Sequence, residues 1–200
     1  VPALSNFLDK AVAVKNYICL PVTGQKNVEP FIAFNELIAG QSEEEVEDVI
    51  VGDRDTLQIM YTSGTTATPK GVMITNLSLY VTALQNVIFA NLNPGNSMSV
   101  FLPLFHCAQQ SLLISAMLVG AKAVIMRGFD PGSFMKMLGW EKINFIFALP
   151  MMYRALLDYQ GNDECDFSSI ERCIYAMTPM DQRTLGDARK KFTSARFTLA

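Results

Sequence analysis

The sequence has little of several features that would point to particular classes of protein. Its single histidine, His106, cannot by itself build a multi-histidine metal site. Its four cysteines are widely spaced and form no CxxC pair, which fits buried thiols in a reducing compartment better than disulfides or a zinc site. It has no basic run and a net charge of −3, which argues against a nucleic-acid surface. No apolar run reaches the roughly 18 residues of a membrane span, and no signal peptide is recognisable.

Hydrophobic residues, by contrast, make up 50% of the 200 residues, and the mean hydropathy is +0.22. Such a chain can bury one sizeable core or two small ones, and it is not expected to be disordered. The chain starts at Val1 without a methionine and ends in residues 196–200, which have the pattern of a strand interior. We therefore expect a fragment of a longer protein.

Short apolar strand patterns alternate with helical patterns along most of the chain. Strands are expected at residues 17–20, 57–61, 72–74, 98–102, 121–126, 143–149, 170–177 and from 196. Helices are expected at residues 30–39, 76–90, 109–119, 130–139, 151–159 and 181–192. This alternation predicts an α/β fold with a mainly parallel sheet, in which ligands lie beyond the carboxyl ends of the strands.

Side-chain patterns add detail to four of the expected helices. Asn76 is expected to cap the helix at 76–90. The apolar stripe of this helix is formed by Val81, Leu84 and Ile88 and is expected to be its buried side. The helix at 109–119 is apolar on nearly all sides and is expected to be buried. Helices are also expected to begin at the N-caps Asp130 and Asp181.

One stretch, residues 60–72, concentrates groups that bind phosphate between two expected strands. Its hydroxyl donors are Thr62, Ser63, Thr65, Thr66 and Thr68. Lys70 supplies a point charge, and Gly64 and Gly71 let the backbone approach closely or adopt a positive φ. The order Pro69-Lys70-Gly71 differs from a Walker A loop, which ends in Gly-Lys-Ser/Thr. By composition alone, an ordinary polar surface loop remains an equal alternative.

The order of these residues resembles the phosphate-binding signature of the adenylate-forming superfamily, which contains acyl-CoA synthetases, firefly luciferases and the adenylation domains of peptide synthetases. Eleven of the twelve positions in residues 61–72 agree, and the departure is Ala67, where the family usually has glycine. A methyl group there is tolerable at negative φ and unfavourable at positive φ. The resemblance implies a nucleotide-binding loop, in which Thr65 and Lys70 take part in catalysis. The implied loop residues are Thr62, Ser63, Gly64, Thr65, Thr66, Ala67, Thr68, Pro69, Lys70 and Gly71.

A second segment, Pro-Leu-Phe-His at residues 103–106, contains the single histidine. From the residues alone, a lone histidine beside an apolar stretch is most often structural, and its neighbour Cys107 is not expected to pair with it as a nucleophile. The segment resembles the second signature of acyl-CoA synthetases, which borders the acyl pocket near the reacting carboxylate. This implies a catalytic role for His106. Peptide synthetase domains generally carry Phe-Asp here, so His106 favours a non-amino acid substrate. The apolar helix at 112–119 suggests a fatty or aromatic tail, although core packing explains it equally well.

A third segment, residues 174–180, loosely resembles the Gly-Gly-Ala-Pro-Leu/Met segment that packs against adenine in the family. Ala176 and Met177 stand at the two glycine positions. The resemblance implies that Ala176, Met177, Thr178 and Pro179 contact the nucleotide. From the residues alone the segment is a strand end followed by a helix-initiating turn. All three segments follow expected strands, so they can converge at one edge of the sheet.

The resemblance covers the chain from about residue 10 and implies part of a large N-terminal domain with layered sheets and helices (αβαβα), without the small C-terminal domain. It implies an acyl-CoA synthetase that uses ATP, Mg²⁺ and CoA. The acid, in our expectation a fatty acid, would form an acyl-adenylate and pyrophosphate, and the thiol of CoA would then displace AMP.

Several expectations follow from this resemblance. The Mg²⁺-binding glutamate would lie beyond Ala200, so no metal ligand is assigned here and the 200 residues alone are expected to be inactive. We expect a small-molecule carboxylic acid as partner, a cytoplasmic location, no nucleic acid and no transmembrane segment, and leave peripheral membrane contact of the full-length protein open. Alternatives are another adenylate-forming enzyme (luciferase-like, an acyl–carrier-protein ligase or a peptide synthetase domain), or a non-catalytic α/β binding module.

Overall fold

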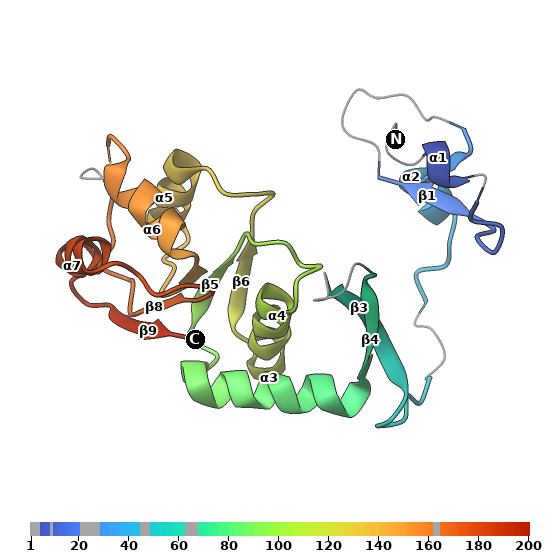
Figure 1. The fold of residues 1–200 in the computed structure, drawn as a ribbon, viewed down its shortest axis with the longest axis horizontal. Helices are drawn as coiled ribbons and strands as arrows, with labels where there is room; N and C mark the ends of the chain where they lie inside the picture. The colour runs from blue at the N-terminus through green and yellow to red at the C-terminus, as the bar shows by residue number, and fades with distance from the viewer. Residues whose placement is uncertain (1–4, 9, 21–28, 45–48, 63–67, 162–164) are drawn as a thin grey trace. The chain divides into compact units, whose positions relative to one another are not determined.

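The computed structural model of the chain describes residues 5–8, 10–20, 29–44, 49–62, 68–161 and 165–200 (Figure 1). The chain forms two compact units, Val1–Val49 and Ile50–Ala200, and each is described by itself. None of the helices in these described ranges has both the length and the apolar character needed to cross a membrane.

The first unit is small and contains a two-stranded parallel sheet. Its elements are α1 (Ser5–Leu8), β1 (Tyr17–Cys19), β2 (Phe31–Ala33) and α2 (Phe34–Ile38). The helix expected at 30–39 is therefore wrong in its first part, since residues 31–33 are a strand. Pairing with β1 places the ring of Phe31 edge-on against Tyr17, with centroids 5.9 Å apart, and Ala33 is buried. A short apolar run fits either period, so these tertiary contacts decide the structure.

The second unit begins with an antiparallel hairpin that leads into a long helix. The hairpin pairs β3 (Thr56–Thr62) with β4 (Lys70–Thr75), and α3 (Asn76–Ala90) follows directly. Thr75 rather than Asn76 caps α3, because its hydroxyl accepts a hydrogen bond from the backbone N–H of Ser78 at 3.2 Å. The expected cap at Asn76 is thus wrong by one residue.

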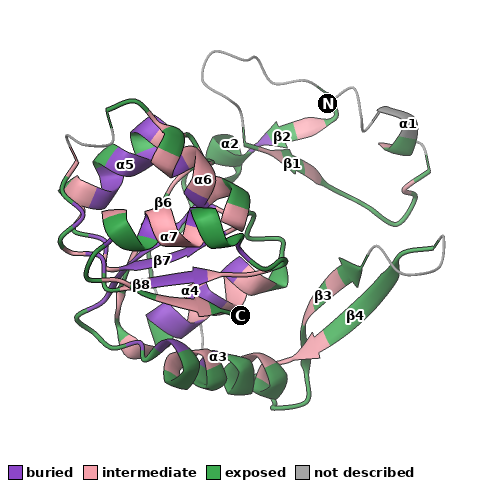
Figure 2. Cartoon of the chain, turned by 60° about the vertical axis from the view of Figure 1, so that its left-hand side comes forward, coloured by how far each residue is buried: buried purple, intermediate pink, exposed green. Residues whose placement is uncertain are grey.

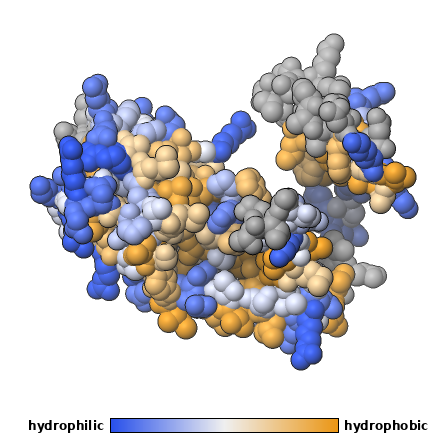
Figure 3. All heavy atoms as spheres, in the orientation of Figure 1, coloured by the Kyte–Doolittle hydropathy of each residue, from blue (hydrophilic) through white to orange (hydrophobic). Residues whose placement is uncertain are grey.

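The buried side of α3 is also different from the expected one. The expected stripe is exposed, by 52% at Val81, 38% at Leu84 and 81% at Ile88. Ala83 and Ala90 are buried instead, on a helix that packs against α4 (Cys107–Val119). Their small side chains suit a close helix contact. Figure 2 shows α3 mostly exposed, and Figure 3 shows hydrophobic atoms along it.

The main sheet has five parallel strands in the order β6-β5-β7-β8-β9. Four helices connect these strands or follow them in the chain. The strands are β5 (Ser97–Val100), β6 (Lys122–Ile125), β7 (Phe145–Ala148), β8 (Arg172–Tyr175) and β9 (Arg196–Leu199), and the helices are α4, α5 (Pro131–Trp140), α6 (Pro150–Asp158) and α7 (Gln182–Lys191). The expected α/β fold with a mainly parallel sheet is confirmed.

Helices cover both faces of this sheet, and alternate residues of β7 show how. Ile146 and Ala148 belong to a buried cluster with residues of α5, α6 and α7, whereas Phe145 and Phe147 belong to one with residues of α3 and α4. Successive side chains of a strand point to opposite faces, so the two clusters lie on opposite sides of the sheet. The result is a helix–sheet–helix layering (Figure 1).

Hydrogen bonds at the helix ends account for several boundaries. Asp130 accepts from the backbone N–H of Ser133 at 2.8 Å, and Asp181 from that of Thr184 at 2.8 Å, so both expected caps are confirmed. Helix α4 starts two residues earlier than expected. It is not buried on all sides, because its Met117 side chain is 70% exposed.

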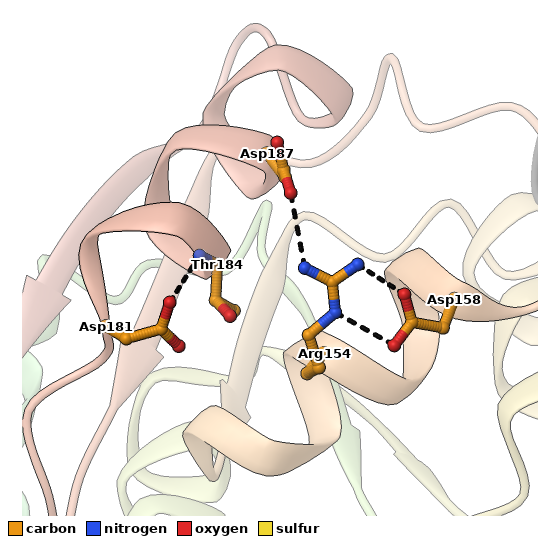
Figure 4. A network of polar contacts seen from close by, with 5 residues as sticks. All are labelled: Arg154, Asp158, Asp181, Thr184 and Asp187. Atoms are coloured by element: carbon orange, nitrogen blue, oxygen red, sulfur yellow. Dashed lines mark hydrogen bonds and ion pairs between the residues drawn. The ribbon is translucent and has the colours of Figure 1, made fainter.

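Helices α6 and α7 are joined by charged side chains, drawn in Figure 4. The guanidinium of Arg154 on α6 forms ion pairs with Asp158 on the same helix and with Asp187 on α7, the latter at 3.2 Å. Its Nε also donates to Asp158 at 2.9 Å. These contacts lie on the outer side of the layer and tie the two helices together.

Candidate functional site

The segment between β5 and α4 forms a compact turn that ends at the single histidine. The backbone N–H of His106 donates to Pro103 O at 3.1 Å. The Nδ1 atom of His106 accepts from the backbone N–H of Ala108 at 3.3 Å, so this side chain is the N-cap of α4. Because Nδ1 accepts, the proton of the neutral ring is assigned to Nε2. The imidazole is thereby held at the helix end with one donor nitrogen not used by the cap.

A cavity of about 180 Å³ lies beside this turn, beyond the carboxyl ends of β5 and β7. Its walls come from the turn, the first turn of α4, and the segments that follow β7 and β8. The lining residues are Leu102, Pro103, Phe105, His106, Ala108, Gln109, Phe147, Leu149, Ala176 and Met177. All but His106 and Gln109 are apolar. The cavity can therefore accept an apolar group whose polar end lies near a histidine.

The structure brings the second and third expected segments together around this cavity. Ala176 and Met177 line it, immediately after β8, while Thr178 and Pro179 are exposed and are not among its lining residues. Met177 has φ +76°, in the left-handed region. That conformation disfavours a residue with a side chain by about 1–2 kcal/mol, and glycine adopts it freely. This explains physically why a glycine fits the position.

Strand β8 is held near the cavity by a buried hydroxyl. Tyr153 on α6 is fully buried, and its hydroxyl donates to Ile174 O at 3.1 Å. Burial raises the pKa of Tyr153 well above its usual value, so the hydroxyl stays protonated. The bond fixes the end of the strand two residues before Ala176.

The first expected segment is carried by the β3–β4 hairpin. Thr62 and Lys70 are paired at the end of the hairpin where residues 63–69 connect its two strands, and both are exposed. The residues between them are partly beyond what the structure describes. Ser63, Gly64, Thr65, Thr66 and Ala67 lie outside the described residues, whereas Thr68, Pro69, Lys70 and Gly71 are described and exposed.

The described part of this segment offers donors that suit phosphate. The ammonium group of Lys70 and the hydroxyls of Thr62 and Thr68 are exposed, so a phosphate can reach them. A Cβ at Gly71 would lie 3.1 Å from Cγ2 of Ile59 across the hairpin, so a side chain there would require Ile59 to shift by a few tenths of an ångström. Among the described residues, no three His, Cys, Asp or Glu side chains come together to hold a metal ion.

Gln109 is a residue of the cavity wall that the sequence patterns do not single out. Its side chain is fully buried, and Oε1 accepts from the backbone N–H of Leu102 at 3.4 Å. Its Nε2 is buried without a hydrogen-bond partner among the described residues. Leaving a buried donor unpaired is unfavourable by about 1–3 kcal/mol. The signal in the sequence is a glutamine at the start of a helix expected to be apolar and buried.

Cys107 is the first residue of α4 and follows His106 in the chain. Its thiol is exposed, and Sγ is 3.9 Å from Nδ1 of His106. Because Nδ1 already accepts from the helix backbone, the ring is engaged as a cap rather than poised as a base for this thiol. The expectation that this pair is not a nucleophile–base pair agrees with that geometry.

The chain is similar in sequence and structure to several ligases. It is 31% identical over 173 residues to 4-coumarate–CoA ligase 1 of Solanum tuberosum, across 84% of this chain and 32% of that enzyme. Its structure resembles O-succinylbenzoate coenzyme A synthetase (MenE) of Bacillus subtilis in complex with ATP and magnesium, with a TM-score of 0.71 and 26% identity over 80% of this chain and 33% of that one.

The N-terminal domain of FACL13 from Mycobacterium tuberculosis shares the fold, with a TM-score of 0.77 and 22% identity over 85% of this chain and 43% of that one. The chain spans about a third of the length of the curated relatives it matches. The profile of the family described as AMP-binding enzyme matches residues 6–198. Since this match covers nearly the whole sequence, the chain belongs to the AMP-binding enzyme family.

Proposed function

We propose that the full-length protein is an acid–CoA ligase that uses ATP to join a small-molecule carboxylic acid to CoA. The observation that carries the proposal is the cavity that Pro103, His106, Ala176 and Met177 share, in a chain of this family. Its apolar walls suit the tail of an acid, and its histidine would bind the carboxylate.

The proposed reaction has two steps. A carboxylate oxygen bonds to the α-phosphorus of ATP while the bond from that phosphorus to the bridging oxygen of the β-phosphate breaks, which releases pyrophosphate. The sulfur of CoA then bonds to the acyl carbon, AMP leaves with the carboxylate oxygen, and the thiol proton passes to solvent. Mg²⁺ bound with ATP would neutralise phosphate charge, and we assign no residue of this chain to it.

The chain's own residues contribute position and charge. Lys70, with the hydroxyls of Thr62 and Thr68, would hold the phosphates, together with residues 63–67 assigned from the sequence alone. Fixed donors around a reacting phosphate act through orientation and electrostatic stabilisation. His106 would donate from Nε2 to the acid, since its Nδ1 is used by the helix.

The tail of the acid is the less determined part of the substrate. The relatives named above are a 4-coumarate–CoA ligase and an O-succinylbenzoate CoA synthetase, and both names denote aromatic acids. We therefore place aryl acids beside fatty acids as candidate substrates, and both fit a cavity with largely apolar walls.

ATP-dependent pyrophosphate release by the full-length protein tests the proposal. The panel is acetate, octanoate, palmitate, benzoate and 4-coumarate, measured for the wild type and for Lys70→Ala. We expect release with fatty or aryl acids, and a loss of about 10²–10³-fold in the variant. Lys190→Ala, an exposed lysine in the last turn of α7, is the control and should keep the wild-type rate. If the folded protein released no pyrophosphate with any acid of the panel, the proposal would be contradicted.

A further inference from the structure

We propose that Gln109 selects the acid, by donating a hydrogen bond from Nε2 to an oxygen acceptor carried on the acid's tail. This role rests on the proposed function and names its substrate class more closely. The class is an acid with a carbonyl, hydroxyl or ether oxygen in its tail, in preference to a plain hydrocarbon acid.

The orientation of the Gln109 carboxamide is assigned from its one hydrogen bond among the described residues. The backbone N–H of Leu102 donates to Oε1 at 3.4 Å, so the oxygen faces Leu102 and the nitrogen faces away. The side chain is fully buried and forms part of the cavity wall. Both hydrogens on Nε2 are thus left in a buried position without an acceptor among the described residues.

Among the described residues, the cavity wall around Gln109 is almost entirely apolar. Apart from His106, its neighbours in the wall are apolar, for example Ala108, Phe147 and Leu149. Buried polar groups in native proteins are nearly always paired, so an unpaired donor in a cavity wall points to a partner that arrives with the ligand. The complementary group on that ligand is an oxygen acceptor.

Little holds the carboxamide away from such a ligand. The bond from Leu102 is long, at 3.4 Å, and the terminal torsion of a glutamine side chain has a broad energy minimum. A modest rotation therefore brings Nε2 to the cavity surface when an acceptor is present. Ser99 Oγ is also buried without a partner among the described residues, but Ser99 is not a lining residue of this cavity.

The experiment compares matched acids that differ by one oxygen. The pairs are cinnamate with 4-coumarate, and octanoate with 3-hydroxyoctanoate, and the rate is ATP-dependent pyrophosphate release by the full-length protein. We expect at least one pair to show a preference for the oxygen-bearing acid, in kcat/KM, of about 10- to 100-fold. In Gln109→Met, which keeps the length and removes the donor, the ratio should fall to about 1.

The neighbouring glutamine provides a matched control. Gln110 is half-buried in the same helix turn but lines a separate cavity with residues of α3, including Ser78 and Thr82. Gln110→Met should keep the wild-type ratio. Melting temperatures of both variants, measured alongside, separate a loss of selectivity from a loss of folding.

Three results would overturn the role of Gln109 and leave the proposed function intact. The first is equal kcat/KM within both pairs for the wild type. The second is an unchanged ratio in Gln109→Met. The third is an equal loss of rate on both acids of a pair together with a lower melting temperature, which would make Gln109 a packing residue. If no acid of either pair or of the wider panel supported pyrophosphate release, the proposed function would be overturned, and the role of Gln109 with it.

Discussion

The Nδ1 atom of His106 accepts a hydrogen bond from the backbone N–H of Ala108 at 3.3 Å, and the same side chain lines the cavity. One residue thus starts helix α4 and borders the candidate site. A loss of activity in a simple alanine variant would mix these two contributions. The two can be separated because the cap needs only a short acceptor, whereas the site would use the imidazole.

His106→Asn is the variant that separates them. Asparagine is among the best N-cap residues, so we expect the melting temperature to stay close to that of the wild type. Pyrophosphate release should fall on the order of 100-fold, because the imidazole donor is lost. His106→Ala should lose the cap as well and lower the free energy of unfolding by about 1 kcal/mol. Wild-type activity in His106→Asn would show that the histidine is only a cap.

The fold of the main sheet is largely predictable from the sequence, and the reason is visible in β7. Residues 145–148 are buried on both faces, so the strand is a continuous apolar run bounded by polar residues and a proline. The N-caps Asp130 and Asp181 are also predictable from the sequence, because a cap depends on contacts within one helical turn. Local rules therefore predict these parts correctly.

Local rules do not predict which side of α3 becomes buried. Val81, Leu84 and Ile88 have helical spacing, but Ala83 and Ala90 are the buried residues of this helix, which packs against α4. Helical periodicity finds the apolar faces of a helix and not the partner that each face will meet. The position of Gln109 in a cavity wall is not predictable from the sequence for a related reason, since segments distant in sequence form that cavity.

Met177 is expected to carry backbone strain that glycine would relieve. Its φ of +76° lies in the left-handed region, and Met177→Gly should raise the free energy of unfolding by roughly 1 kcal/mol. Because Met177 also lines the cavity, the variant should shift activity toward bulkier acids. Ala176→Gly is the control, since Ala176 has no positive φ, and it should not stabilise. Denaturant unfolding measures both, and a destabilised Met177→Gly would contradict the prediction.

Two cysteines of the second unit should differ sharply in reactivity. Cys107 is exposed at the start of α4, whereas Cys173 is buried in the sheet, where burial raises the pKa of its thiol to about 12. Iodoacetamide at pH 8 should label Cys107 rapidly and Cys173 only after unfolding. Native Cys173 should stay largely unlabelled at both pH 7 and pH 9, because its thiol is buried and only a small fraction of it ionises below its pKa.

Peptide mass spectrometry follows each cysteine of the labelling experiment separately. Cys107→Ser is the control variant and should remove the fast phase while leaving Cys173 protected. Labelling of Cys173 in native protein at the rate of Cys107 would contradict the buried position of β8. Protection of Cys107 would mean that its exposed thiol is covered in solution.

The ion pairs of Arg154 predict a specific dependence of stability on pH. The hydrogen bonds from Arg154 lower the pKa of Asp158 below its usual value. A carboxyl whose folded pKa is depressed stabilises the fold above its unfolded pKa of about 4, and that contribution is lost as the pH falls through the folded pKa. Arg154→Met should therefore be less stable than the wild type at pH 7, with the difference shrinking below about pH 4.

The difference in stability between Arg154→Met and the wild type should also shrink in 1 M NaCl, because the Arg154 and Asp158 side chains are partly exposed and salt screens them. Urea unfolding at pH 7, 5 and 3 measures the difference, and Lys190→Met, an exposed change on α7, controls for the loss of one positive charge. A difference that stays constant across this range would mean that Arg154 stabilises the α6–α7 contact through the packing of its stem rather than through its charge.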